Sequence, residues 1–254
     1  MKSEKPFIKH LSHKLGIAIC ILAIVLIQAH DTSAQTQTMS IEEYEPKSTL
    51  VVSGKELSRA KYPFIDVHSH QWRNPSAEAV KKMVAEMDAM YMKVLVNLSG
   101  RSGKALIDSV KAFKGRYPKR FLTFANVDFR KIDEPNFGEN AAKQLEKDVR
   151  NGASGLKIFK NLGLTLKDKS GKRVPTDDPR LDPIFAKCAE LGIPVLIHTG
   201  EPIAFFDTHD KFNERWLELK MFPRRARPVD RFPSWERVMN EQFSLFAKNP
   251  KTIF

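Results

Sequence analysis

The sequence has 254 residues, of which 42% are hydrophobic and 28% charged, with 12 Gly and 15 Pro. These fractions are typical of a globular domain, and they exclude a disordered chain, a collagen-like repeat and a multi-span membrane protein. The 42 Lys and Arg outnumber the 30 Asp and Glu, so the formal net charge is +12. Two Cys residues cannot build a disulfide-rich scaffold.

The first 34 residues have the layout of a secretory signal peptide. Four lysines precede an apolar run, Leu15–Ile27, that is shorter than the roughly 20 residues of a membrane-spanning helix. Because Thr32 and Ala34 are small, we expect cleavage after Ala34 and export to the periplasm or the outside of the cell, with no stable membrane anchor left. An uncleaved anchor is the alternative. After cleavage Cys188 is the single Cys, expected on the buried face of a helix.

From residue 63 onward, predicted strands alternate with predicted helices, whereas residues 35–62 are expected to form a linker or arm. We predict strands at Phe64–His70, Lys93–Leu98, Arg120–Asp128, Gly155–Lys160 and Ile193–Thr199, and the start of a sixth at Thr252. We predict helices at Asn74–Met92, Lys104–Lys114, Asn140–Asn151, Pro183–Leu191 and Trp235–Lys248. This alternation is typical of βαβ units in a parallel sheet, either doubly wound or closed into a barrel. No Gly-x-Gly-x-x-Gly turn follows a strand, which disfavours the dinucleotide-binding fold.

The strongest chemical signal lies in the first predicted strand. Side chains alternate along a strand, so Asp66, His68 and His70 share one face, while Ile65 and Val67 are expected to pack against helices. Two imidazoles at this spacing can bind one divalent ion. Exposed or hydrogen-bonded histidines are the alternative, but a place at the C-terminal end of a strand favours a metal site.

Two further residues are expected at the same rim of the sheet. His198 ends the fifth predicted strand, and the ends of parallel strands meet where α/β folds place their sites. Three histidines plus a carboxylate would hold Zn²⁺ or a similar ion and leave it open to water or substrate. Lys157 faces inward by the same alternation, where it can bind an anionic substrate or, once carboxylated, bridge two metals. A lysine whose ammonium reaches solvent is the alternative.

Three segments, Phe-Ile-Asp-Val-His-Ser-His, Gly-Leu-Lys-Ile-Phe and Pro-Val-Leu-Ile-His-Thr-Gly-Glu-Pro, resemble the first, fourth and fifth strands of the amidohydrolase superfamily. The branch they resemble contains TIM-barrel metal-dependent hydrolases and aromatic-acid decarboxylases. The resemblance covers residues 64–254 and implies an α/β fold, a partial (β/α)8 barrel with about five and a half βα units. It implies three metal ligands, His68, His70 and His198, and a site-wall or metal-bridging role for Lys157. Further candidates for contacts with substrate or a second metal are Asp66, Arg73 and Glu201.

The resemblance also places residues beyond the end of this sequence. The family has another metal-binding His after its sixth strand, and after its eighth an Asp that relays the proton of the attacking water. The sequence ends at Phe254, where the sixth strand is expected to begin. We therefore expect a C-terminally truncated domain whose catalytic residues lie beyond Phe254.

Residues 201–234 are too long for a plain connection between a strand and a helix. They are rich in aromatic residues and arginine, and Phe212, Trp216 and Leu219 are predicted to share one helical face. We expect the segment as a whole to form a lid over the metal site. Most of its individual side chains are expected instead to have a structural role, as parts of a surface subdomain with a core of its own.

The sequence thus predicts a metal-dependent hydrolase, in which a divalent ion activates water for attack on an amide, ester or lactone carbonyl. One alternative is decarboxylation of an aromatic acid at the same site, with an arginine on the substrate carboxylate. The other is an inactive or binding fragment, because five or six strands leave two open sheet edges. The expected partner is a small molecule, a carboxylate or aromatic compound. Nucleic acid is not expected as a partner, because the positive charge is scattered along the chain. The formation of a homo-oligomer is possible.

Overall fold

The computed structural model describes residues 40–41, 43–45, 47–51, 54, 57–71 and 75–254. The chain divides into two compact units, residues 1–50 and 51–254. The predicted signal peptide, residues 1–34, and the candidate Arg73 lie outside the described residues. Up to residue 62, the residues that are described are exposed. Within the described part of the chain, no helix has the length and apolarity needed to cross a membrane.

Five parallel strands form one sheet in the sequential order β1-β2-β3-β4-β5. Their bounds are Phe64–Ser69 for β1, Met92–Asn97 for β2, Phe121–Asn126 for β3, Gly155–Ile158 for β4 and Val195–Ile197 for β5. All five lie within the predicted strands, to within a residue. Parallel neighbours in chain order, each joined to the next by a helix, are the first five units of a (β/α)8 barrel. The predicted fold class, a partial α/β barrel, is confirmed.

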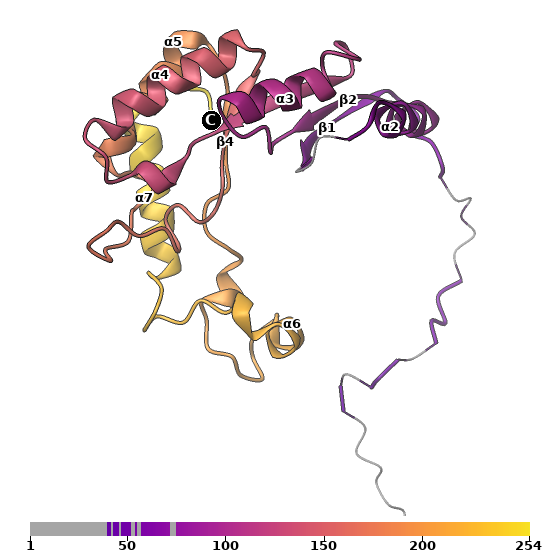
Figure 1. Cartoon of the computed structure of the whole chain (residues 1–254). Helices are drawn as coiled ribbons and strands as arrows, with labels where there is room; N and C mark the ends of the chain where they lie inside the picture. The colour runs from indigo at the N-terminus through magenta and orange to yellow at the C-terminus, as the bar shows by residue number, and fades with distance from the viewer. Residues whose placement is uncertain (1–39, 42, 46, 52–53, 55–56, 72–74) are drawn as a thin grey trace, which may run out of the picture. The chain divides into compact units, whose positions relative to one another are not determined.

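Helices connect the strands and continue after β5 (Figure 1). They are α2 (Ala77–Met90), α3 (Lys104–Ala112), α4 (Phe137–Arg150), α5 (Asp182–Leu191), α6 (Trp216–Met221) and α7 (Trp235–Lys248). Two of them begin at a serine cap, because the Oγ atoms of Ser76 and Ser234 accept hydrogen bonds from the backbone N–H groups of Ala79 and Arg237. Asn74, where the first helix is predicted to begin, lies outside the described residues.

The main core lies between the sheet and helices α4 and α5, which run side by side in Figure 1. Leu156 and Ile158 of β4 are buried there, on the face of the strand that packs against the helices. Phe185 and Cys188 of α5 join the same core. Cys188 is completely buried, as predicted, and burial raises the pKa of its thiol to about 12.

The burial of one face of β1 differs from the prediction. Ile65 and Val67 are 55% and 58% exposed, although helices were expected to cover them. β1 is an edge strand that pairs with β2 alone in the described part of the chain. The alternation of apolar and polar residues shows which side chains share a face, but it does not show what covers that face.

The segment after β5 builds a small core of its own with α7. Phe205, Phe206 and Leu219 are buried against Val238. The prediction that Phe212 lies on a helical face with Trp216 and Leu219 is wrong, because Phe212 precedes α6 and is 82% exposed. Its backbone N–H donates to the Oδ1 of Asp210 over 2.8 Å, and such a local bond competes with helix formation.

The last residues approach β5 without forming a strand. The backbone N–H of Val195 donates to the carbonyl of Ile253 over 2.8 Å, which is a contact of the kind that a sixth strand would make. Residues 252–254 do not form a strand in the structure. The predicted start of a sixth strand is therefore not seen, and one hydrogen bond to β5 stands in its place.

Candidate metal and substrate site

Two histidines at the end of β1 form the centre of the candidate site. The ring centroids of His68 and His70 lie 5.2 Å apart, with an angle of 67° between the ring planes. Zn–N bonds of about 2.0–2.1 Å would place the centroids of two tetrahedrally arranged imidazoles about 5.3 Å apart. The separation of this pair therefore fits two ligands of one divalent ion.

Buried polar residues at the end of β2 fix the orientation of His70. Its Nδ1 lies 2.9 Å from the Oγ of Ser99, a serine that is 2% exposed. The backbone N–H groups of Ser99 and Gln71 donate in turn to the Oδ1 of Asn97, which is completely buried. A second hydrogen bond of this kind orients the ring of a metal-binding histidine and leaves Nε2 as the ligating atom.

His198 follows β5 directly and is exposed. Desolvation and the nearby ammonium groups of Lys157 and Lys160 lower its pKa, His68 lowers it as well, and Glu201 acts in the opposite direction. The pKa of His70 is lowered too, by desolvation first and then by His68 and Lys157. Lowered pKa values keep these imidazoles neutral, and the neutral form is the one that binds a metal.

Lys157 on β4 lies inside the protein, as predicted. Its side chain is 1% exposed, so its ammonium does not reach solvent. The Nζ atom has no hydrogen-bond partner among the described residues and lies 5.6 Å from the centroid of the Phe159 ring. Desolvation lowers its pKa to about 8. A buried cation without a hydrogen-bonding partner is costly, and an anionic group beside it would offset that cost.

A cavity of about 310 Å³ adjoins Lys157. Phe159 and Asn161 line it from the segment that follows β4, and Arg130 and Lys167 add two more cations. Asp133 is the one acidic residue in its wall among the described residues. The positive excess suits a ligand that carries a carboxylate.

Glu201 and Asp66 are both engaged by neighbouring residues of the chain. Glu201 Oε1 accepts from Lys160 Nζ over 2.7 Å and from Arg227 Nη2 over 2.6 Å, and its side chain is 6% exposed. Asp66 Oδ1 accepts from the backbone N–H of His68 over 2.9 Å. In this arrangement Glu201 connects the segment after β5 to the end of β4, and Asp66 shapes the strand end that carries His68.

The candidate ligands are not fully gathered. Within the residues that the structure describes, no three His, Cys, Asp or Glu side chains are arranged around one position that would hold a metal. The donor chemistry and the spacing of His68 and His70 fit a divalent ion, and His68 lies near enough to His198 to lower the pKa of the His198 imidazole. The structure therefore brings two of the predicted ligands together and leaves the third nearby.

Sequence reasoning missed Ser99 and Asn97. Both are polar residues at the end of the apolar strand β2, in the same position along their strand as the histidines along theirs. That shared position is the signal that would have indicated them.

A family model described as amidohydrolase matches residues 65–235. The matched region is well over half of the chain and contains both strand ends that carry the candidate histidines. This chain belongs to the amidohydrolase family. No curated protein matches the sequence of this family member.

Solved structures resemble this amidohydrolase-family chain at low sequence identity. The 2,6-dihydroxybenzoate decarboxylase from Rhizobium has a TM-score of 0.45 and 15% identity, over 76% of this chain and 65% of the decarboxylase. The 5-carboxyvanillate decarboxylase from Novosphingobium aromaticivorans, solved with bound manganese, has a TM-score of 0.42 and 17% identity, over 71% of this chain and 53% of its own. The chain thus spans less than two thirds of either decarboxylase.

Proposed function

We propose that the protein is a metal-dependent hydrolase that acts on an amide, ester or lactone. The observation that supports this proposal most directly is the His68 and His70 pair, whose 5.2 Å centroid separation fits one divalent ion. Imidazole donors suit Zn²⁺, which is the ion that we propose. When bound, such an ion supplies Lewis acidity toward a carbonyl and lowers the pKa of water.

The side chains of this family member would have distinct tasks. His68 and His70 would hold the ion, with His198 as the third ligand once it moves closer. Ser99 would hold the ring of His70 through its Nδ1, so that Nε2 faces the ion. Lys157, which is buried and lines the same cavity as Phe159, would bind an anionic group of the substrate and orient it.

The metal content of the protein tests this proposal. We expect about one zinc per chain by elemental analysis of the whole protein. The double substitution His68→Ala and His70→Ala is expected to abolish metal binding, because it removes both members of the pair. The control is His209→Ala, which changes an exposed histidine whose Nε2 contacts the backbone carbonyl of Trp216 instead. A double variant that keeps its full metal content would refute the proposal.

A second candidate function is the decarboxylation of an aromatic acid, and the positive excess around Lys157 favours it. The buried ammonium and the nearby Lys167 would bind a carboxylate, whereas the Arg130 guanidinium already binds Asp128. Release of CO2 from aromatic acids, measured beside hydrolysis of esters and lactones, separates the two activities. A protein that binds metal but shows neither activity would support the binding-only alternative.

The role of Lys157 can be tested by the substitution Lys157→Met, which keeps the length of the side chain and removes its charge. We expect the dissociation constant for benzoate, measured by calorimetry, to rise about tenfold or more, because a charge-assisted hydrogen bond is lost. The free energy of unfolding should stay equal or rise, since a buried unpaired amine becomes an apolar side chain. Lys169→Met, at an exposed position outside the cavity, is the control. Equal benzoate affinity in all three proteins would contradict this role.

A further inference from the structure

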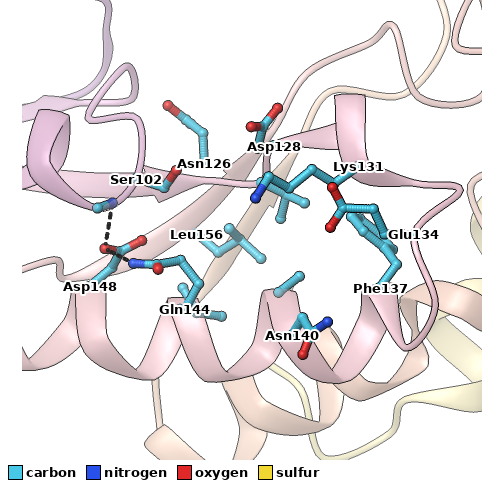
Figure 2. A pocket seen from close by; sticks show the side chains of 14 residues that line it. Ser102, Asn126, Asp128, Lys131, Glu134, Phe137, Asn140, Gln144, Asp148 and Leu156 are labelled. Carbon is cyan, nitrogen blue, oxygen red and sulfur yellow. Dashed lines mark hydrogen bonds between the residues drawn. The ribbon is translucent and has the colours of Figure 1, made fainter.

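A second cavity of about 310 Å³ is lined by Asn126, Val127 and residues of helix α4 (Figure 2). One stretch of chain, from Ser102 at the start of α3 to Leu156 of β4, supplies every residue of its wall. The two cavities share Asn126 and Val127, but this one contains none of the candidate metal ligands. A volume of this size is enough for a small organic molecule.

Asp148 of α4 is the most deeply buried charged group of this wall, with an exposed fraction of 1%. Its Oδ1 accepts from the backbone N–H of Gly103 over 2.8 Å and from the Nε2 of Gln144 over 2.9 Å. Both bonds engage the same oxygen, and Figure 2 shows the other oxygen directed toward the middle of the cavity. Among the described residues no donor reaches Oδ2. Burial raises the pKa of this carboxyl, and the hydrogen bonds from Gly103 and Gln144 act in the opposite direction.

The rest of the cavity wall consists of an apolar part and a charged rim. Phe137 and Leu145 of α4, together with Leu156, give it an apolar surface. At its rim, Glu134 and Lys131 carry opposite charges, and the Arg130 guanidinium already binds Asp128 at 2.7 Å. The rim charges therefore balance, and Asp148 leaves the cavity with a net negative charge.

We propose that this cavity binds a small organic cation, in which an ammonium or amidinium group donates to Asp148 Oδ2 and an apolar body packs on Phe137 and Leu145. A carboxylate ligand is disfavoured, because it would face a buried carboxylate. A neutral ligand or water would satisfy the oxygen but leave its charge uncompensated. The site does not depend on the proposed hydrolase activity, because it uses none of the residues assigned to that activity.

The test uses benzylammonium as the probe and calorimetry with the whole protein. We expect saturable binding of benzylammonium and none of phenylacetate, which carries the opposite charge, or of benzyl alcohol, which has the same shape but no charge. Asp148→Asn is expected to weaken binding about tenfold or more, because it removes the charge while keeping the size of the side chain. Asp108→Asn is the control, since this residue lies on the neighbouring helix α3 and pairs with Lys104 on the surface.

A second variant keeps the test decisive if Asp148→Asn does not fold. Ala141→Trp places a large ring in the cavity wall without changing any charge, and it is expected to abolish benzylammonium binding. Backbone amide chemical shifts of Gly103 and Gln144 should move on titration with the probe. The proposal is overturned if the wild-type protein shows no saturable binding, if benzyl alcohol binds equally well, or if both cavity variants bind as tightly as the wild type.

Discussion

Replacing Phe185 with alanine is expected to lower the free energy of unfolding by about 3–5 kcal/mol. Phe185 lies on α5, is 1% exposed, and belongs to the core between that helix and the sheet. Its ring centroid is 5.6 Å from that of Phe254, so the substitution also removes an aromatic contact. Helices and strands surround the position, and they can close only partly around the space that the ring leaves.

Urea unfolding of the wild-type and variant proteins measures this loss. Phe243→Ala is the matched control, because the same residue type on α7 is 66% exposed. A surface substitution of this kind is expected to change the free energy of unfolding by about 0.5 kcal/mol or less. Similar losses for the two phenylalanines would mean that α5 does not pack against the sheet as described.

Replacing Glu201 with alanine is expected to loosen the segment after β5, at a cost of about 3 kcal/mol in its local opening free energy. Glu201 Oε1 accepts from Lys160 Nζ and from Arg227 Nη2, and the Arg227 side chain is only 12% exposed. Without the carboxylate, the Arg227 guanidinium stays buried with fewer partners, whereas Lys160, at 44% exposed, can turn to water. Most of the cost therefore falls on Arg227.

Hydrogen exchange over residues 202–231 measures this effect. The expected result is faster exchange in this segment and unchanged exchange in α4 and α5. Glu218→Ala is the matched control, because Glu218 pairs with Arg215 and Arg225 at the surface of the same segment, and exposed pairs contribute at most about 1 kcal/mol. Exchange that stays slow in the Glu201 variant would show that the segment is held by its apolar core alone.

The order and type of the elements could be predicted, because buried strands and amphipathic helices leave a strong period in the sequence. The helix Trp235–Lys248 was predicted to the residue. The boundaries of α4 were harder: the helix begins at Phe137, earlier than the expected Asn140, after Asn136 adopts a left-handed conformation with φ 55°. A single-residue turn of this kind has no periodic signal. The hydrogen bond that Asp210 Oδ1 accepts from the backbone N–H of Phe212 likewise competes with helix formation there, and it has no periodic signal either.

The candidate site could be predicted in part. Residues at strand ends, such as His70 and Lys157, follow from alternation and from the parallel sheet. Partners from distant segments do not follow: Arg227 meets Glu201 from 26 positions away, and Gly103 meets Asp148 from 45. Asp148 itself lies among the charged residues of α4, where sequence alone indicates a solvent-facing position. Such contacts can be identified only when the tertiary fold is known.

Cys188 has a practical consequence for studying how the segment after β5 moves. It is the one cysteine within the described residues, it is fully buried, and its raised pKa keeps the thiol protonated at neutral pH. Thiolates are the species that react with maleimides, so this side chain should stay unlabelled in the native protein. A Phe212→Cys substitution, at a position that is 82% exposed, would then accept a fluorophore without prior removal of Cys188, once Cys20, which lies outside the described residues, is replaced by serine.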